Sequence, residues 1–146
     1  MAANADSDVL RPVRIFTLAV AAGLVLLVPG ALTVAGRFEW PELWVWILLI
    51  AGFAYGAGSS AYVVKMIKPR VANPDMRKIL RGVAWLRLVL SAMPAFIALA
   101  VSLWLNTAIP YLVAVPAGVG LLLAFYPRES LVAAIRSRLE ELEVRR

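Results

Sequence analysis

Long uncharged runs of apolar residues, separated by short charged segments, set the pattern of this chain. Ile15 to Gly36 and Leu43 to Val64 each form a run of 22 residues without a charged side chain. A third run, Leu88 to Pro127, extends over 40 residues. The hydrocarbon core of a bilayer is about 30 Å thick and takes roughly 20 helical residues to cross. The first two runs therefore predict one membrane-spanning helix each, and the third is long enough for two.

A turn is expected near the middle of the third run, where Asn106, Thr107 and Pro110 are residue types that interrupt helices. The sequence has no segment that alternates apolar and polar residues as the strands of a membrane β-barrel do. The pattern thus predicts an all-α, polytopic membrane protein. Its four transmembrane helices would cover about residues 15–36, 43–64, 83–105 and 108–126.

The last segment, residues 127–146, differs in composition from the four spans, and residues 1–14 form a short segment ahead of them. In the last segment, leucine and isoleucine recur at helical spacing with charged residues between them, which predicts an amphipathic helix. Such a helix lies on a membrane surface or contacts a partner helix. Because its polar face carries both signs of charge, we expect its apolar residues to contact a partner or a second copy of the chain. These residues are Leu131, Ile135, Leu139 and Leu142.

The composition supports the membrane assignment. Apolar residues make up 62% of the 146-residue chain and charged residues only 16%. Soluble proteins average about 45–50% and about 25%. A soluble domain of this size could not bury so much apolar surface, and a disordered chain would hold far less of it.

Basic residues are distributed unevenly about the predicted spans. With four crossings, both ends of the chain and the loop between the second and third spans lie on one side, which then holds 14 of the 15 Lys and Arg residues. Only Arg37 lies on the other side. The positive-inside rule therefore predicts cytoplasmic termini, in a membrane of the bacterial inner-membrane type. The alternative, a signal peptide cleaved after Thr33-Val34-Ala35, would leave three spans.

The net charge of +6 is explained in the same way, so we expect contact with anionic lipid and not with nucleic acid. The candidate lipid or anion contacts are Arg77, Lys78, Arg81 and Arg87. Arg87 is the one charge inside a predicted span, and its side chain either snorkels to the surface or contacts an anion or lipid headgroup. The sequence Asn73-Pro74-Asp75 predicts the start of the third helix, with Asn as its cap.

The second predicted span contains an unusual number of small residues, nine of eleven from Ala51 to Ala61. Small residues four positions apart let helix backbones approach closely in lipid. The candidates for such packing are Gly52, Gly56, Ser59 and Ser60. We expect this packing mainly within one chain, and a dimer face is the alternative.

Residues that carry out chemistry are scarce. The chain has no His and no Cys, which excludes thiolate nucleophiles, imidazole bases and metal sites built from these ligands. All nine acidic residues lie outside the predicted spans, which disfavours a proton-coupled exporter. Glu39 and Glu42 share a short loop, but two flexible carboxylates make a poor cation site. We therefore expect no catalytic residue, cofactor or metal.

Three short stretches resemble a recurrent type of small bacterial four-span membrane protein: Ser91 to Phe96 (SAMPAF), Ile109 to Leu112 (IPYL) and Phe125 to Glu129 (FYPRE). The overall plan is similar to the ATP synthase subunit I family. Here the shared elements are Arg11 to Phe16 (RPVRIF), the glycine-rich second span and Arg87 early in the third span. This chain has no Asn or Gln in its second span. The resemblance implies a role in assembly of the membrane rotor of an ATP synthase.

These observations together predict a non-enzymatic membrane protein. We expect an accessory, structural or assembly factor that acts through helix packing and its C-terminal helix, with a membrane-protein partner or a second copy of itself. A small oligomeric transporter or channel is the alternative, because the second span is rich in small residues and Arg87 lies within the third.

Overall fold

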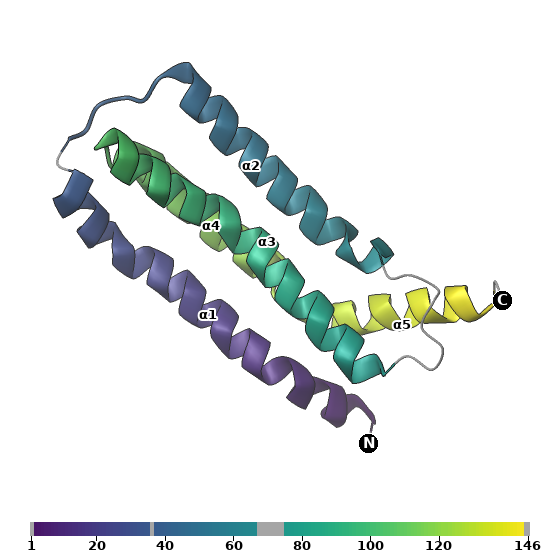
Figure 1. Ribbon diagram of the computed structural model, residues 1–146. Coiled ribbons are helices and arrows are strands. Elements are labelled where there is room, and N and C mark those ends of the chain that lie inside the picture. Colours follow the sequence, from purple (N-terminus) through teal and green to yellow (C-terminus); the bar gives the residue numbers. More distant parts are fainter. Residues whose placement is uncertain (1, 36, 67–74, 145–146) are drawn as a thin grey trace.

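The computed structural model describes residues 2–35, 37–66 and 75–144, of which 2–7 and 142–144 are described by their backbone alone. Every regular element in this part of the chain is a helix, which confirms the predicted all-α class (Figure 1). The elements are α1 (Ala2–Ala35), α2 (Leu43–Tyr62), the short 3-10 helix η1 (Val63–Met66), α3 (Met76–Leu105), α4 (Ile109–Ala124) and α5 (Glu129–Val144).

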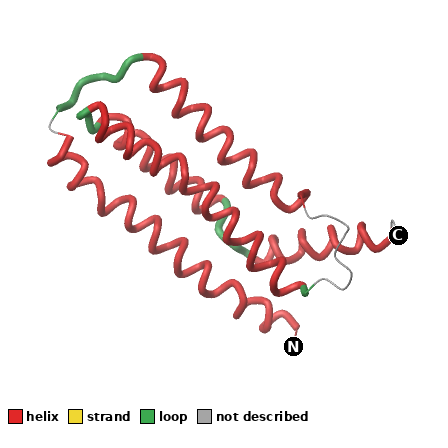
Figure 2. The backbone as a smooth tube through the Cα atoms, viewed as in Figure 1, coloured by secondary structure: helices red, strands yellow, loops and turns green. Residues whose placement is uncertain are grey.

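Four of the helices run side by side along a common axis, and α3 lies at the centre of the bundle (Figure 2). It packs against α1, α2 and α4, and α4 also contacts α1 and α2. The buried face of α3 consists largely of small residues, among them Ser91, Ala95, Ala98 and Ser102. Small side chains let three neighbouring helices approach the same central helix, because little side-chain volume then separates the backbones.

Three helices are long and apolar enough to cross a membrane: Asp8–Ala35, Leu43–Met66 and Met76–Leu105. The fourth, α4, has 16 residues and is about 24 Å long. It reaches the length of a span only together with α5, to which it is joined across a bend of 58°. Large apolar side chains on the outside of the bundle, such as Leu26 at 77% and Ile50 at 68% exposure, fit contact with lipid. The protein is thus a multi-pass membrane protein with three candidate spans, or four if the bent pair counts as one.

Two helices begin earlier than the predicted spans. The first helix starts at Ala2 and continues through the charged positions ahead of Ile15. The third starts at Met76, seven residues before the predicted Val83, and is capped by Asp75, whose carboxylate accepts the backbone N–H of Arg77 at 3.1 Å. The cap had been predicted at Asn73, which lies outside the described residues. Apolar pattern alone shows where a helix meets lipid and does not show how far it extends into the charged segments beyond.

The predicted turn in the long third run coincides with the break between α3 and α4. Asn106 ends α3 with a left-handed backbone, at φ 53° and ψ 36°, which asparagine tolerates better than most residues. The backbone N–H of Thr107 donates to the carbonyl of Ser102 at 3.0 Å, which satisfies one of the free carbonyls in the last turn. Pro110 then lies in the first turn of α4, where its missing N–H costs nothing.

Candidate functional site

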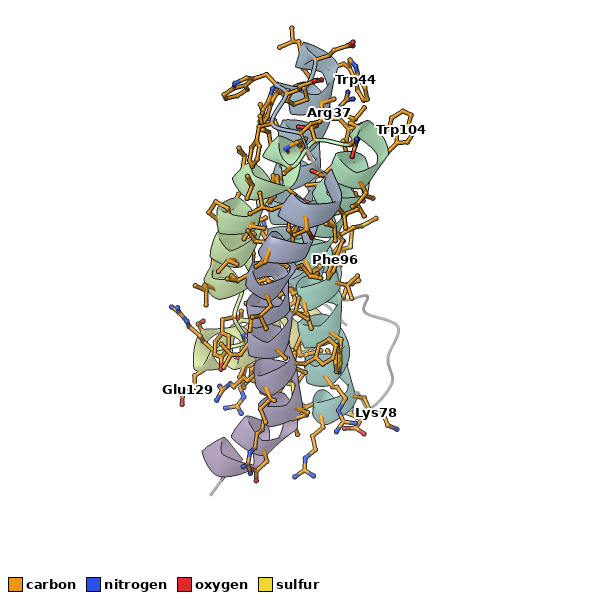
Figure 3. The ribbon with its side chains drawn as sticks, turned by 90° about the vertical axis from the view of Figure 1, so that its left-hand side faces the viewer. Arg37, Trp44, Lys78, Phe96, Trp104 and Glu129 are labelled. Atoms are coloured by element: carbon orange, nitrogen blue, oxygen red, sulfur yellow. The ribbon has the colours of Figure 1, made fainter. Side chains whose placement is uncertain are left out.

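The two ends of the bundle differ in chemistry (Figure 3). Trp44, Trp104 and Arg37 lie at one end, which we call the tryptophan end, and Lys78 and Glu129 lie at the other. The opposite end, where α1 and α3 begin, we call the arginine end. Its exposed basic side chains include those of Arg11, Lys65, Arg77, Lys78, Arg81 and Arg128.

Arg87 connects three helices near the arginine end. Its Nε donates a hydrogen bond of 2.9 Å to the carbonyl of Ser60, in the last turn of α2. Its guanidinium carbon lies 5.6 Å from the ring centre of Phe125, the residue that caps α4. The carboxyl end of a helix carries partial negative charge, and an aromatic face also attracts a cation. Arg87 is therefore turned toward the bundle's own helix ends, and its contact with a lipid or anion stays a prediction.

The contact between α2 and α3 is built from small residues. A Cβ atom at Gly56 would lie 2.8 Å from the backbone oxygen of Leu90 and 3.0 Å from Cγ of Pro94. One turn further on, the hydroxyls of Ser60 and Ser91 are 3.1 Å apart, and both side chains are buried. Of the four packing candidates, the structure places Gly56 and Ser60 directly against α3.

The other two candidates make no such close approach. Gly52, one turn before Gly56, lies on the same side of α2 and lines a pocket with Pro94 and Ile97 of α3, but no atom lies within 4 Å of the position that its Cβ would take. Ser59 is half-buried. The backbones of α2 and α3 are thus in close contact at Gly56 and separate toward Gly52, which the sequence pattern did not show.

A second small-residue face of α2 points away from the bundle. It has exposed residues at alternating spacings of four and three: Ile47, Ala51, Ala54, Gly58 and Ala61. We call these five residues the outward seam. A spacing that averages 3.5 residues is the one by which a second helix packs along the first. Sequence reasoning missed this face because the same segment also supplies the contact with α3.

Tyr55 borders the outward seam and is 70% exposed. It lies 12 residues along α2 from Leu43, about 18 Å into the span. Within the residues that the structure describes, its hydroxyl has no hydrogen-bond partner. A polar group at this depth is costly unless another protein group pairs with it, since lipid chains offer no acceptor.

The C-terminal helix packs onto its own bundle. Leu131 and Ile135 are buried at the arginine end in a cluster with residues of α1, η1 and α3, and Leu139 packs at its edge. Arg14 helps to hold the bend before α5, because its Nε donates to the carbonyl of Pro127 at 2.8 Å. The side chain of Leu142 lies outside the described residues. Leu131 and Ile135 were expected to contact a partner helix, and here they are already covered by the chain itself.

Several buried hydroxyl groups of the bundle are paired within the chain. The hydroxyl of Tyr111, which is fully buried, donates to the carbonyl of Leu24 at 2.6 Å. Ser102 accepts the backbone N–H of Tyr111 at 2.9 Å. Among the described residues, no group of three His, Cys, Asp or Glu side chains could hold a metal ion.

Comparison of the chain with protein-family models, with curated proteins and with solved structures gives no match. The resemblance to the ATP synthase subunit I family therefore depends on the short motifs alone, and it stays a prediction.

Proposed function

We propose that the protein is a non-enzymatic accessory or assembly subunit of a membrane complex, and that it binds a transmembrane helix of a partner protein along the outward seam of α2. In this proposal the four helices of the bundle, α1 to α4, cross a membrane of the bacterial inner-membrane type. The arginine end then faces the cytoplasm, as the positive-inside rule favours.

The observation that carries the proposal is the pairing of the outward seam with Tyr55. Exposed Ala and Gly residues at the seam spacing allow another helix to approach closely, and such contacts drive helix association in lipid. The phenol at 70% exposure supplies an unpaired hydroxyl beside the seam. A lipid chain could cover the apolar seam, but it could not accept that hydrogen bond. A helix with a backbone or side-chain acceptor does both.

The seam also stands apart from the contacts that hold the fold together. Gly56 and Ser60 face α3, whereas a Cβ at Gly58 would meet no atom within 4 Å. A partner can therefore occupy the seam without disturbing the bundle. The C-terminal helix offers less for this role, because its buried residues are already used within the chain.

The matched glycines Gly58 and Gly120 test the proposal. Both are exposed, both are helical, and neither has an atom within 4 Å of the position that a Cβ would take, but only Gly58 belongs to the seam. Wild-type protein, Gly58→Leu and Gly120→Leu would each be purified in mild detergent. Mass spectrometry would then identify and quantify any protein that co-purifies. We expect a stoichiometric partner with wild type and Gly120→Leu, and its loss with Gly58→Leu.

Cross-linking identifies the surface directly, because the chain contains no cysteine. A single cysteine at position 58 should cross-link to the partner, and one at position 120 should not. Equal partner recovery with both leucine variants would overturn the proposal. Cross-linking of position 58 to position 58 of a second copy would also overturn it and would make the seam a homodimer contact.

The second function considered from the sequence, an oligomeric transporter or channel, has less support. The buried hydroxyls of Ser60, Ser91 and Tyr111 are engaged within the chain, Ser60 with Ser91 and Tyr111 with the carbonyl of Leu24, and so do not line a polar pathway.

A further inference from the structure

Two pockets lie one below the other in the crevice between α2 and α3, at the tryptophan end. The first, of about 280 Å³, we call the acidic pocket, and it is lined by Glu39, Trp40, Pro41, Glu42, Trp44, Val45, Leu105 and Thr107. The second, of about 270 Å³, we call the apolar pocket, and it is lined by Leu48, Leu49, Gly52, Pro94 and Ile97.

Helical spacing aligns the two pockets along one crevice. On α2, the positions Trp44, Leu48 and Gly52 follow one another at intervals of four residues, so they share a face. On α3, Leu105 and Ile97 are eight residues apart and also share a face. The apolar pocket therefore continues the acidic one by about 12 Å toward the middle of the bundle. Gly52 keeps the apolar pocket open, because a side chain at this position would occupy space that no other atom fills.

The acidic pocket is more firmly built than two carboxylates in a short loop would suggest. The hydroxyl of Thr107 donates to the backbone carbonyl of Glu39 at 2.7 Å, and the backbone N–H of Ala108 donates to the carbonyl of Arg37 at 3.2 Å. These bonds tie the loop to the turn between α3 and α4. The indole Nε1 of Trp44 donates to Glu42 Oε2 at 2.7 Å, which fixes a carboxylate beside an aromatic ring.

The tryptophans are positioned by further ring contacts. Trp40 lies 5.9 Å from Trp46, and Trp44 lies 6.4 Å from Trp104, measured between ring centres. Carboxylates beside aromatic faces favour an organic ammonium, because both attract positive charge and the rings also contact its alkyl groups. A bare metal ion would gain nothing from the rings. The ion pair that competes for Glu39 is weak, since Arg37 is 3.9 Å away and both side chains are well exposed.

We propose that this double pocket binds an amphiphilic ammonium compound, with the ammonium group in the acidic pocket and an alkyl chain in the apolar pocket. Pockets of this combined size fall in the range of about 300–1,000 Å³ that small ligands occupy. The chemistry is shared by an amine-headgroup phospholipid and by a soluble alkylammonium compound. The site is independent of the outward seam, since none of the five seam residues lines either pocket.

Binding is tested on the full-length protein in nonionic detergent, with four probes: phosphatidylethanolamine, phosphatidylglycerol, dodecyltrimethylammonium and tetramethylammonium. Native mass spectrometry counts bound lipid, and tryptophan fluorescence follows the soluble probes. We expect phosphatidylethanolamine or dodecyltrimethylammonium to bind at least about tenfold more tightly than phosphatidylglycerol or chainless tetramethylammonium. Tighter binding of phosphatidylethanolamine identifies a lipid ligand, and tighter binding of dodecyltrimethylammonium identifies a soluble one.

Two variants separate the halves of the site, and a third serves as control. The double variant Glu39→Gln with Glu42→Gln should weaken the preferred ammonium probe about tenfold, as expected when close opposite charges are lost. Gly52→Leu should fill the apolar pocket without an internal clash and should weaken the same probe to a similar degree. Gly120→Leu, on α4 and lining neither pocket, should leave binding unchanged.

The assignment would be overturned if phosphatidylethanolamine bound no more tightly than phosphatidylglycerol and dodecyltrimethylammonium bound no more tightly than tetramethylammonium. Wild-type affinity in both the glutamine and the Gly52→Leu variants would also overturn it. Because the partner experiment depends on Gly58→Leu and this one depends on Glu39, Glu42 and Gly52, failure of either proposal can be recognised separately.

Discussion

The close approach of α2 to α3 at Gly56 yields a quantitative prediction. A methyl group at this position would lie 2.8 Å from the backbone oxygen of Leu90 and 3.0 Å from the ring of Pro94. Neither neighbour can rotate away, because one is main chain and the other is a proline within a helix. The two helices must therefore separate when Gly56 is replaced by Ala.

The cost is estimated from two opposing effects. Overpacking of a well-packed contact costs about 1–3 kcal/mol, and the replacement of a helical Gly by Ala returns about 0.8–1.0 kcal/mol. We therefore expect Gly56→Ala to lower the free energy of unfolding by up to about 2 kcal/mol, and by about 1–3 kcal/mol relative to an alanine substitution that meets no clash. The matched control is Gly58→Ala, where the new methyl group meets no atom within 4 Å and should be neutral or slightly stabilising.

Thermal unfolding in nonionic detergent, followed by circular dichroism, measures the difference between the two variants. Gly56→Ala should unfold several degrees below Gly58→Ala, and Gly56→Leu should unfold lower still. Equal melting temperatures for the two alanine variants would refute the argument, because the helices would then not be in contact at Gly56.

Three further predictions concern other parts of the bundle. Tyr111→Phe removes the buried hydrogen bond to the carbonyl of Leu24 and should lower the free energy of unfolding by about 0.5–1.5 kcal/mol, measured by the same thermal assay. Ile135→Ala should cost about 2–5 kcal/mol, because the side chain is fully buried at the arginine end, and proteolysis of α5 should become faster. A single cysteine at Phe38 should react with a membrane-impermeant maleimide added outside intact cells, whereas one at Ser130 should react only after the membrane is opened.

Each of these three predictions would be contradicted by a different result. Unchanged stability of the phenylalanine variant would mean that the hydroxyl gains no more from the carbonyl than from its surroundings in the unfolded state. If α5 in the Ile135→Ala variant resisted proteolysis as well as in wild type, the position of the helix would not depend on the buried cluster at the arginine end. Labelling of both cysteines from outside would contradict the four-span topology.

The broad architecture was predictable from local pattern. The first two uncharged runs have the length of one bilayer crossing each and the third has the length of two, and the start of α2 at Leu43 and the break at Asn106 coincide with predicted positions. The start of α3 at Met76 directly follows the predicted start signal, with Asp75 as the cap. The start of α1 at Ala2 was harder to predict, because the segment ahead of Ile15 contains charged residues and hydropathy does not distinguish a charged helical turn from a loop.

The packing candidates on α2 show where sequence reasoning stopped. Small residues surround this helix on several sides, so spacing alone could not tell which of them face α3. Arg87 is a similar case, because the sequence placed it in a span but could not show the carbonyl of Ser60 that receives its hydrogen bond. Glu39 and Glu42 looked flexible in a short loop. The hydroxyl of Thr107 reaches the carbonyl of Glu39 only when distant segments meet, and the indole of Trp44 holds the carboxylate of Glu42 two residues away.

The sequence by itself determined that this chain forms apolar helices of bilayer length, because hydrophobic transfer acts residue by residue along each run. Only the tertiary structure decided which faces of those helices are used within the bundle and which remain outside. In lipid, apolar side chains gain little by leaving their surroundings for another helix, so the hydrophobic pattern does not choose a neighbour. The choice depends instead on shape and on polar pairing, as at Gly56 against Leu90 and at Tyr55, whose hydroxyl faces outward.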